Sequence, residues 1–326
     1  MVTKKPVIIP IASGKGGVGK TFFTANLAIA LSQKGHRTIA VDLDLGGSNL
    51  HTFLGLPNKF PGVGDFLKAR QTELADLVTS TSFANLQFLA GDGRTPFMAN
   101  IAHAQKIRLV SRLGKLPAEY ILLDLGAGTT YNTLDFFGLS PHGILVTTPE
   151  YPAILSMLAF LKQFMLRTIE RHLVGDNEIK SYLQAFYKQP LDEQQNSIVA
   201  VKSQIAKIDP DAGAYISALC EKFRPRVIFN HGDDPAEIEI ADKIDQSLAN
   251  VLSIKADYFG FIFNDPTVRQ AVKSNRSFMH YRPEGLTAQI IGRIAERIIR
   301  YWDTPIKNSA ALVTSNTEKL QQQHPF

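Results

Sequence analysis

A Gly-rich run near the N-terminus constrains the fold of this chain more than any other feature. The run GKGGVGKT, from Gly14 to Thr21, matches the pattern G-x-x-x-x-G-K-[ST]. It follows the apolar, strand-like stretch VIIPIA at 7–12 and opens the helix-forming segment TFFTANLAIALSQKG. A turn of this kind points several backbone N–H groups at one anion, and the helix N-terminus adds positive potential. The sequence therefore predicts a phosphate-binding loop, although such a turn could also join a strand to a helix and bind nothing.

Single residues of this loop have expected tasks. Lys20 would bridge the β- and γ-phosphates of a nucleotide, and the Thr21 hydroxyl would complete the coordination shell of Mg²⁺. The glycines allow the backbone to approach the phosphates closely. The residues expected to contact the nucleotide here are Gly14, Gly16, Gly17, Val18, Gly19, Lys20, Thr21 and Phe22.

Short apolar runs recur along the chain, with helix-length segments between them. Continuous runs that end in Asp, Gly, Asn or Pro are typical of strands buried on both faces. Their alternation with helices predicts a doubly wound α/β fold of the P-loop NTPase type, in which helices flank a mostly parallel, twisted sheet. The predicted strands are 7–12, 38–44, 86–91, 120–126, 143–149, 226–231 and 258–263, and the predicted helices are 20–33, 98–116, 153–172, 235–250 and 286–302.

The length of 326 residues allows either two ordinary domains or one large α/β domain. Residues 174–222 contain helix-like pieces and no strand-like run, which predicts a helical insertion before the strand at 226–231. The residues after Trp302 are polar and weakly patterned. We therefore expect a single P-loop domain over 1–302, with the insertion inside it, and a flexible tail over 303–326.

The chain has one cysteine, Cys220, which excludes an intrachain disulfide and an all-cysteine zinc or iron–sulfur site. No signal-peptide pattern stands out. The apolar stretch AILSMLAFL at 153–161 is ended by Lys162, short of the ~20 residues that span a bilayer. These features favour a cytoplasmic location.

Acidic side chains follow two of the predicted strands. Asp42 and Asp44 end the second strand, and Asp124 ends the run YILLDLG. Open α/β sheets bind ligands at the carboxyl ends of their strands, where a carboxylate can reach Mg²⁺ directly or through water. Each aspartate could instead cap the turn that follows it. We expect Thr21, Asp44 and Asp124 to hold the metal ion.

The segment SGKGGVGKT carries a second lysine, Lys15, directly after its first glycine. This resembles the deviant Walker A motif of the MinD/ParA ATPases, in the SIMIBI class of P-loop proteins. DLDLGGSNLHTFLG and LLDLGAGTT resemble the switch I and switch II segments of that family, and IFNH resembles its adenine-side strand. The motifs stand in the family's order over 7–302, apart from the insertion, and look closest to the MinD and FlhG subgroups.

The resemblance implies a catalytic set of Lys15, Lys20 and Asp44. Lys15 would reach across an ATP-dependent homodimer to the phosphates of the partner subunit. A cation placed where charge develops on the γ-phosphate stabilises the transition state, so hydrolysis would depend on dimerisation. Asp44 would position the attacking water. The alternative for Lys15 is a solvated loop lysine that contacts its own nucleotide.

The resemblance also implies further nucleotide contacts. Asn49 would belong to the wall of switch I, and Asp124 and Gly126 would lie where switch II senses the γ-phosphate. Asn230 would hydrogen-bond adenine, although an asparagine after a strand is often only a turn former.

The implied function is that of an ATPase switch with ATP and Mg²⁺ as cofactors. Such a switch hydrolyses ATP to ADP and phosphate and positions a cellular structure, such as a division site, flagellum, chromosome or other cargo, with a protein activator or cargo adaptor. The alternatives are an ATP-binding scaffold with negligible hydrolysis and an ATP-dependent ligase on the same fold. Cys220 alone cannot support the iron–sulfur relatives of the family.

Much of the basic excess lies near the C-terminus. Residues 264–307 hold eight Lys or Arg and four acids, so 8 − 4 gives +4 of the net +5. The region could form a surface for nonspecific DNA or an anionic membrane, which would place the protein on the nucleoid or at the inner face of the cell membrane. The simpler interpretation, which the pattern favours, is the solvated face of a closing helix that packs on the core. Its basic residues are Arg269, Lys273, Arg276, Arg282, Arg293, Arg297, Arg300 and Lys307.

Three features depart from the MinD pattern. MinD proteins place an Asp six residues after the Pro-Glu of the loop at 149–150, able to pair with the signature lysine, and here Ser156 stands there. The partner of Lys15 without nucleotide is therefore open. The insertion is absent from typical MinD, and the tail does not resemble the membrane-binding helix that ends MinD.

Overall fold

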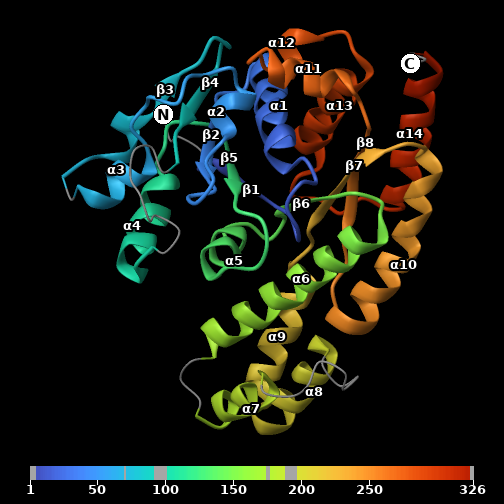
Figure 1. Cartoon of the computed structure of the whole chain (residues 1–326). Helices are drawn as coiled ribbons and strands as arrows, with labels where there is room; N and C mark the ends of the chain where they lie inside the picture. Colours follow the sequence, from blue (N-terminus) through green and yellow to red (C-terminus); the bar gives the residue numbers. More distant parts are fainter. Residues whose placement is uncertain (1–4, 70, 92–100, 174–176, 188–196, 324–326) are drawn as a thin grey trace.

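The computed structural model describes residues 5–69, 71–91, 101–173, 177–187 and 197–323. These residues form an eight-stranded sheet in the order β3-β4-β2-β5-β1-β6-β7-β8 (Figure 1). β3 is antiparallel to β4, and the other neighbours are parallel, which confirms the predicted sheet. The strands are β1 (Val7–Ala12), β2 (Thr38–Leu43), β3 (Thr79–Ser80), β4 (Leu86–Leu89), β5 (Tyr120–Leu125), β6 (Ile144–Thr147), β7 (Arg226–Gly232) and β8 (Asp257–Phe263).

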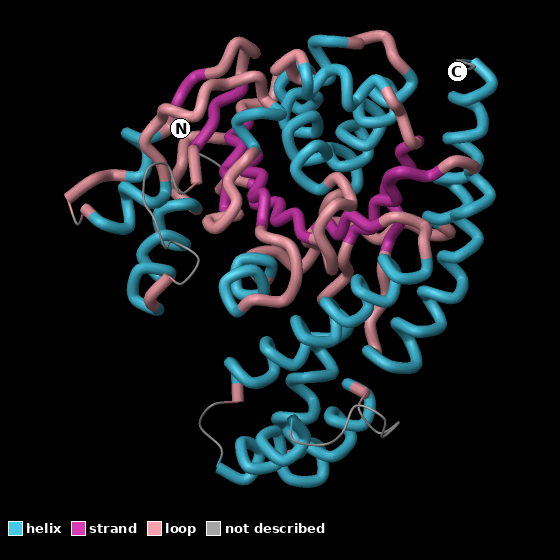
Figure 2. Tube along the Cα trace, viewed as in Figure 1, coloured by secondary structure: helices cyan, strands magenta, loops and turns pink. Residues whose placement is uncertain are grey.

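Helices cover both faces of the sheet, with α1 and α13 on one side and α5 and α6 on the other (Figure 2). Short 3-10 and π segments, η1 (Leu74–Leu77), η2 (Pro235–Glu239) and η3 (Leu248–Leu252), complete the connections. The α-helices are α1 (Lys20–Gln33), α2 (Leu50–Phe53), α3 (Val63–Lys68), α4 (His103–Leu113), α5 (Tyr131–Phe137), α6 (Tyr151–His172), α7 (Asn177–Tyr187), α8 (Ile198–Ile208), α9 (Pro210–Lys222), α10 (Ile240–Ser247), α11 (Thr267–Lys273), α12 (Phe278–Tyr281), α13 (Leu286–Tyr301) and α14 (Ser309–Gln323).

The core explains why the apolar runs lack alternation. Every residue of β2 and of β8 is buried, as expected of strands covered on both faces. α1 is buried around most of its circumference because it lies between the sheet and α13. The strand end that carries the Gly-rich loop is therefore held by packing on both sides.

In the predicted insertion at 174–222, the described residues form three helices, α7, α8 and α9, which make a lobe beyond the end of α6 (Figure 1). The lobe buries its own apolar residues, including Leu183 of α7, Val201 of α8 and Ile216 of α9. The part of the predicted helix 98–116 before residue 101 lies outside the described residues.

α6 continues through Lys162, where the sequence suggested an end to the apolar stretch. Among the described helices it is the one that is long and apolar enough to cross a membrane by length and composition. Half of its apolar window is buried inside the protein, and a core helix passes the same test. Met157, Phe160 and Leu161 of this helix are fully buried in the core.

The structure differs from the expected flexible tail, because α14 occupies 309–323. Val313, Thr317 and Leu320 recur at helical spacing and are buried, and α14 packs on β8, the last strand of the sheet. The Ser309 hydroxyl accepts a hydrogen bond from the amide of Tyr258 in β8 at 3.0 Å. A helix with a weak apolar stripe gains most of its stability from tertiary packing, here on the last strand of the sheet. The sequence pattern does not reveal this contact.

Candidate nucleotide-binding site

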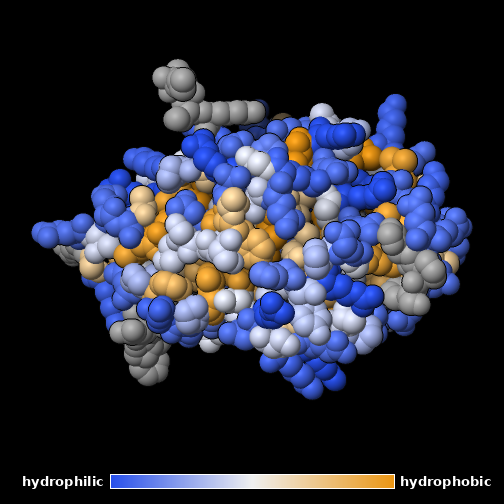
Figure 3. Space-filling model, turned by 90° about the horizontal axis from the view of Figure 1, so that it is seen from above, coloured by the Kyte–Doolittle hydropathy of each residue, from blue (hydrophilic) through white to orange (hydrophobic). Residues whose placement is uncertain are grey.

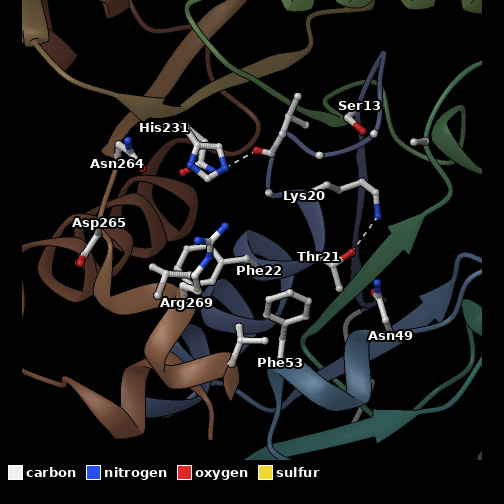
Figure 4. A pocket seen from close by; sticks show the side chains of 18 of the residues that line it. Ser13, Lys20, Thr21, Phe22, Asn49, Phe53, His231, Asn264, Asp265 and Arg269 are labelled. Carbon is white, nitrogen blue, oxygen red and sulfur yellow. Dashed lines mark hydrogen bonds between the residues drawn. The ribbon is translucent and has the colours of Figure 1, made fainter. Parts of the chain in front are cut away.

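A cavity of about 750 Å³ opens at the carboxyl ends of the strands. It lies between the Gly-rich loop with α1 on one side and the ends of β7 and β8 with α11 on the other (Figure 4). Its volume is in the range of small-molecule and cofactor sites. Sequence reasoning missed several of its lining residues, namely Phe53, His231, Asn264, Asp265 and Arg269.

The loop between β1 and α1 needs glycine at particular positions. Gly17 and Gly19 have φ angles of 84° and 83°, in the left-handed region that favours glycine. A Cβ atom at Gly14 would lie 2.2 Å from the backbone oxygen of Ser156 in α6. The loop is therefore pressed against the first turns of α6, which no local pattern predicts.

Lys20 and Asp124 meet at the base of the loop, with Lys20 Nζ 2.7 Å from Asp124 Oδ1. Both side chains are buried, and Thr24 Oγ1 donates to the same carboxylate oxygen at 2.9 Å. Lys20 Nζ also donates to Thr21 Oγ1 at 3.3 Å. The structure thus brings together the lysine, hydroxyl and carboxylate that the sequence assigned to phosphate and metal. A bound nucleotide would compete with Asp124 for Lys20.

The donor set fits Mg²⁺ bound together with a nucleotide. Asp124 Oδ2 is buried, and no hydrogen bond to it was found in the described part of the chain. The described residues contain no cluster of three or more His, Cys, Asp or Glu that could hold a metal ion by itself. Mg²⁺ usually keeps several waters and takes one or two protein carboxylates together with phosphates. Thr21 and Asp124 could supply the protein's share.

Asp44 lies where the two switch segments meet. Its Oδ1 is 3.4 Å from the position that a Cβ atom would occupy on Gly126. Asp44 and Asn49 line the cavity and Gly126 lies beside Asp44, while the roles of these residues toward nucleotide, metal and water stay predictions.

Asp42 anchors the segment after β2 that resembles switch I. Its Oδ1 accepts a hydrogen bond from the amide of Asp44 at 3.1 Å, and its Oδ2 accepts one from the amide of Leu50 at 3.0 Å. Asp42 is fully buried and pairs with Asp124 in the register of β2 and β5. Burial, together with the charge of Asp124, raises the pKa of Asp42 to about 8. The sequence placed Asp42 at this edge but did not indicate this positioning role.

Asp42 predicts a pH dependence of stability in the nucleotide-free protein. Its folded pKa lies above the unfolded value of 3.8, so the folded state keeps a proton that the unfolded state loses between about pH 4 and pH 8. Stability from this group therefore falls as pH rises through that window. In thermal melts at pH 5 and pH 8, Asp42→Asn should gain melting temperature relative to wild type at the higher pH. A difference that does not change with pH would contradict the raised pKa.

Lys15 finds a partner that the sequence did not indicate. Its Nζ lies 3.6 Å from Glu150 Oε2, with the two side chains 36% and 68% exposed. Glu150 precedes α6, and the Ser156 hydroxyl is turned back to the Pro152 carbonyl at 2.8 Å. An exposed pair at this distance is weak, so Lys15 can leave it at little cost.

The side chain of Asn230 contacts the Gly-rich loop. Its Nδ2 donates to the Val18 carbonyl at 2.8 Å, and the residue is 2% exposed. The neighbouring His231 has a φ of 58° and lines the cavity, and burial lowers its pKa. The adenine contact of Asn230 stays a prediction, and the structure adds a bond that ties β7 to the loop.

Phe22 and Phe53 form an apolar wall of the cavity, with ring centroids 6.4 Å apart and edge-on (Figure 4). Asp265, on the opposite wall, is held by the hydroxyls of Thr267 and Thr287. These contacts join segments far apart in the sequence. An aromatic wall with fixed polar groups opposite suits a planar base.

The basic side chains of the C-terminal region do not all face solvent. Ile290, Ile291 and Ile294 of α13 are buried and face the core. Arg297 does not point to solvent, because it donates to the Phe259 carbonyl at 2.7 Å and burial lowers its pKa. Seen from above, the molecule shows hydrophobic residues among the hydrophilic ones (Figure 3). The membrane or DNA surface stays a prediction.

A Gly-rich loop joins β1 to α1 in a doubly wound sheet, and Lys20 of this loop pairs with Asp124 at the end of β5. These features define a P-loop nucleotide-binding protein. The chain belongs to the CobQ/CobB/MinD/ParA nucleotide binding domain family, whose model matches residues 9–297. This family includes the MinD and ParA P-loop ATPases.

Curated relatives match the chain over part of their length. The septum site-determining protein MinD of Helicobacter pylori is 34% identical over 149 residues, which is 45% of this chain and 55% of that protein. For MinD of Bacillus subtilis the identity is 35% over 147 residues, 45% and 54% of the two chains. The flagellum site-determining protein YlxH of Helicobacter pylori is 33% identical over 156 residues, 47% and 52% of the two chains. The chain spans about half the length of these relatives.

Solved structures share the fold over nearly the whole chain. MinD of Pyrococcus horikoshii, complexed with Mg-ADP, has a TM-score of 0.59 and 22% identity, covering 92% of this chain and 100% of that chain. MinD in the MinC:MinD complex of Aquifex aeolicus has a TM-score of 0.59 and 19% identity, covering 93% and 99%.

Proposed function

We propose that the protein is a Mg-ATP-dependent dimerisation switch. ATP and Mg²⁺ bind in the cavity above the Gly-rich loop, two copies associate across it, and hydrolysis to ADP and phosphate separates them. Contacts to the γ-phosphate exist only before hydrolysis, so hydrolysis shifts the population back to the monomer. The cycle would position a cellular structure through a protein activator or cargo adaptor, as the names of the MinD and YlxH relatives suggest.

The position of Lys15 carries this proposal. Lys20 is buried at the base of the loop, whereas Lys15 lies at the surface in a weak pair with Glu150. Tyr151 and Leu155, in the first turns of α6 beside it, are 68% and 47% exposed. A weakly held cation next to exposed apolar side chains suits a surface that a second copy covers. A scaffold without hydrolysis would not require the acidic Asp44 at the junction of the switches.

Asp44→Ala should trap the dimer. Without the carboxylate that we assign to the attacking water, ATP would stay intact, and the γ-phosphate contacts would hold two copies together. Size-exclusion chromatography with light scattering, in ATP and Mg²⁺, should show a dimer for Asp44→Ala and a monomer for the same variant in ADP. Asp303→Ala, which removes an exposed aspartate outside the cavity, should behave as wild type. A wild type that hydrolyses ATP normally yet stays monomeric in every nucleotide would exclude the switch.

The trapped dimer also tests the cargo surface. Co-sedimentation with anionic liposomes or with DNA would assign the basic region at 264–307 to one of these partners. Binding to neither would indicate that a protein adaptor engages the dimer.

A further inference from the structure

A second cavity of about 510 Å³ lies away from the Gly-rich loop, where the end of α6 meets α7 and the start of α4. Arg167 and Arg171 line it from α6, and Lys180, Leu183 and Tyr187 line it from α7. α7 belongs to the helical lobe (Figure 1), so the insertion itself builds one wall of this cavity. The nucleotide site uses none of these residues.

The charge beneath this cavity is positive in excess. Arg167 Nε and Arg171 Nη1 lie 3.2 and 3.1 Å from Asp135 Oδ1, and Lys106 Nζ binds the other oxygen of that carboxylate. Burial opposes ionisation of Asp135, but the hydrogen bonds from Lys106 and Arg167 hold its pKa below the ordinary value. Glu170 also pairs with Arg167, at 3.1 Å. Three cations (Lys106, Arg167 and Arg171) therefore pair with only two carboxylates (Asp135 and Glu170). Lys180 adds a further positive charge.

The cavity walls supply further donors and an apolar part. Tyr187 is 45% exposed and its partial burial raises its pKa to about 12; its hydroxyl is protonated at neutral pH, as in any tyrosine, and can donate a hydrogen bond. Leu173 and Leu183 provide apolar surface beside it. The Arg171 side chain is 49% exposed, so part of its guanidinium can be reached by a ligand. Guanidinium groups bind carboxylate and phosphate through paired N–H donors.

We propose that this cavity binds a small organic anion. Arg167, Arg171 and Lys180 would hold its phosphate or carboxylate group, and its apolar or aromatic part would rest on Leu183 and Tyr187. The volume suits a ligand of this size, and the lining, mainly of polar and charged residues, includes apolar surface from Leu173 and Leu183.

The ligand would act on the nucleotide site through α5. Asp135 lies in α5, and two residues earlier Thr133 Oγ1 donates to the carbonyl of Gly126 in switch II at 3.4 Å. A bound anion would attract the guanidinium groups of Arg167 and Arg171 toward the cavity. Their hydrogen bonds to Asp135 would then weaken, and α5 would be held less firmly against α6. This regulatory step rests on the proposed ATPase cycle, whereas binding of the anion does not.

Isothermal titration calorimetry tests the binding directly. Phenyl phosphate, benzoate and inorganic phosphate are titrated separately into the full chain, with the nucleotide site filled by Mg-ADP. We expect binding of phenyl phosphate or benzoate, weakened about tenfold or more by Arg171→Gln and by Lys180→Gln, because each removes a charge-assisted hydrogen bond. Arg300→Gln is the matched control, since Arg300 is exposed on α13 outside the cavity and should bind as wild type.

The outcomes separate this site from the ATPase. The proposal fails if none of the probes binds to wild type, or if both variants bind as tightly as wild type. Binding of inorganic phosphate alone, lost in Arg171→Gln, would also overturn it, because the apolar part of the cavity would then take no part in recognition. Because the readout needs no hydrolysis, a chain that binds the anion but lacks ATPase activity would contradict only the proposed function.

Discussion

Gly14→Ala should abolish ATP binding and lower the melting temperature. The new Cβ atom would stand 2.2 Å from the backbone oxygen of Ser156, and backbone cannot turn aside as a side chain can. Either the loop or the start of α6 must move, which costs about 1–3 kcal/mol for an overpacked site. Because phosphate binding needs N–H groups aimed at one point, the displaced loop would lose nucleotide as well. Thermal melts and titration with a fluorescent ATP analogue measure the two effects.

Gly16→Ala is the control for the melting temperature. A Cβ atom at Gly16 would meet nothing within 4 Å, although the residue lies in the same loop. We expect its melting temperature to stay within about 2 °C of wild type, which corresponds to less than about 1 kcal/mol. If both variants lose the same melting temperature, the loss in Gly14→Ala does not come from the contact with α6.

Lys15→Ala should separate ATP binding from ATP hydrolysis. Lys15 lies at the surface, apart from the buried Lys20, so its loss should leave the affinity of a monomer for ATP within a few-fold of wild type. If it supplies the charge that a partner subunit needs at the γ-phosphate, turnover should fall about a thousandfold. Steady-state phosphate release and equilibrium binding of ATP measure the two quantities.

Glu150→Gln provides the matched control for Lys15. The substitution frees Lys15 from its pair and removes no cation, and a pair this exposed contributes less than about 1 kcal/mol. Turnover should therefore stay within a few-fold of wild type. A loss as large as that of Lys15→Ala would mean that Glu150, rather than the lysine alone, takes part in hydrolysis.

The sequence predicted most of the long helices, seven of the strands and their order, because those depend on local pattern, but it did not predict the short helices α2, α3, α5, α11 and α12. α1 begins and ends at the predicted residues, and the three helical pieces of the insertion form α7, α8 and α9. The short strand β3 escaped prediction because two residues carry no period. α14 escaped because its apolar stripe is weak and gains its stability from β8.

The candidate site was predictable in part. The loop residues and the strand-end aspartates were visible because phosphate and metal chemistry demands those residue types at those spacings. The far wall of the cavity, with His231 and Arg269, was not visible, since it comes from strand ends and a short helix that carry no comparable motif. The second cavity was hidden for the same reason, although its helices were predicted.

By itself, the sequence determined a strand, a Gly-rich loop and a helix at 7–33, and the family to which the chain belongs. Only the tertiary structure decided which distant groups meet. Lys20 pairs with Asp124, a residue 104 positions away, and Asn230 bonds to Val18 across 212 positions. The sequence left the partner of Lys15 open, and the structure places Glu150 beside it. Such contacts depend on the register of strands and the approach of helices, which arise from packing of the whole core rather than from any local run of residues.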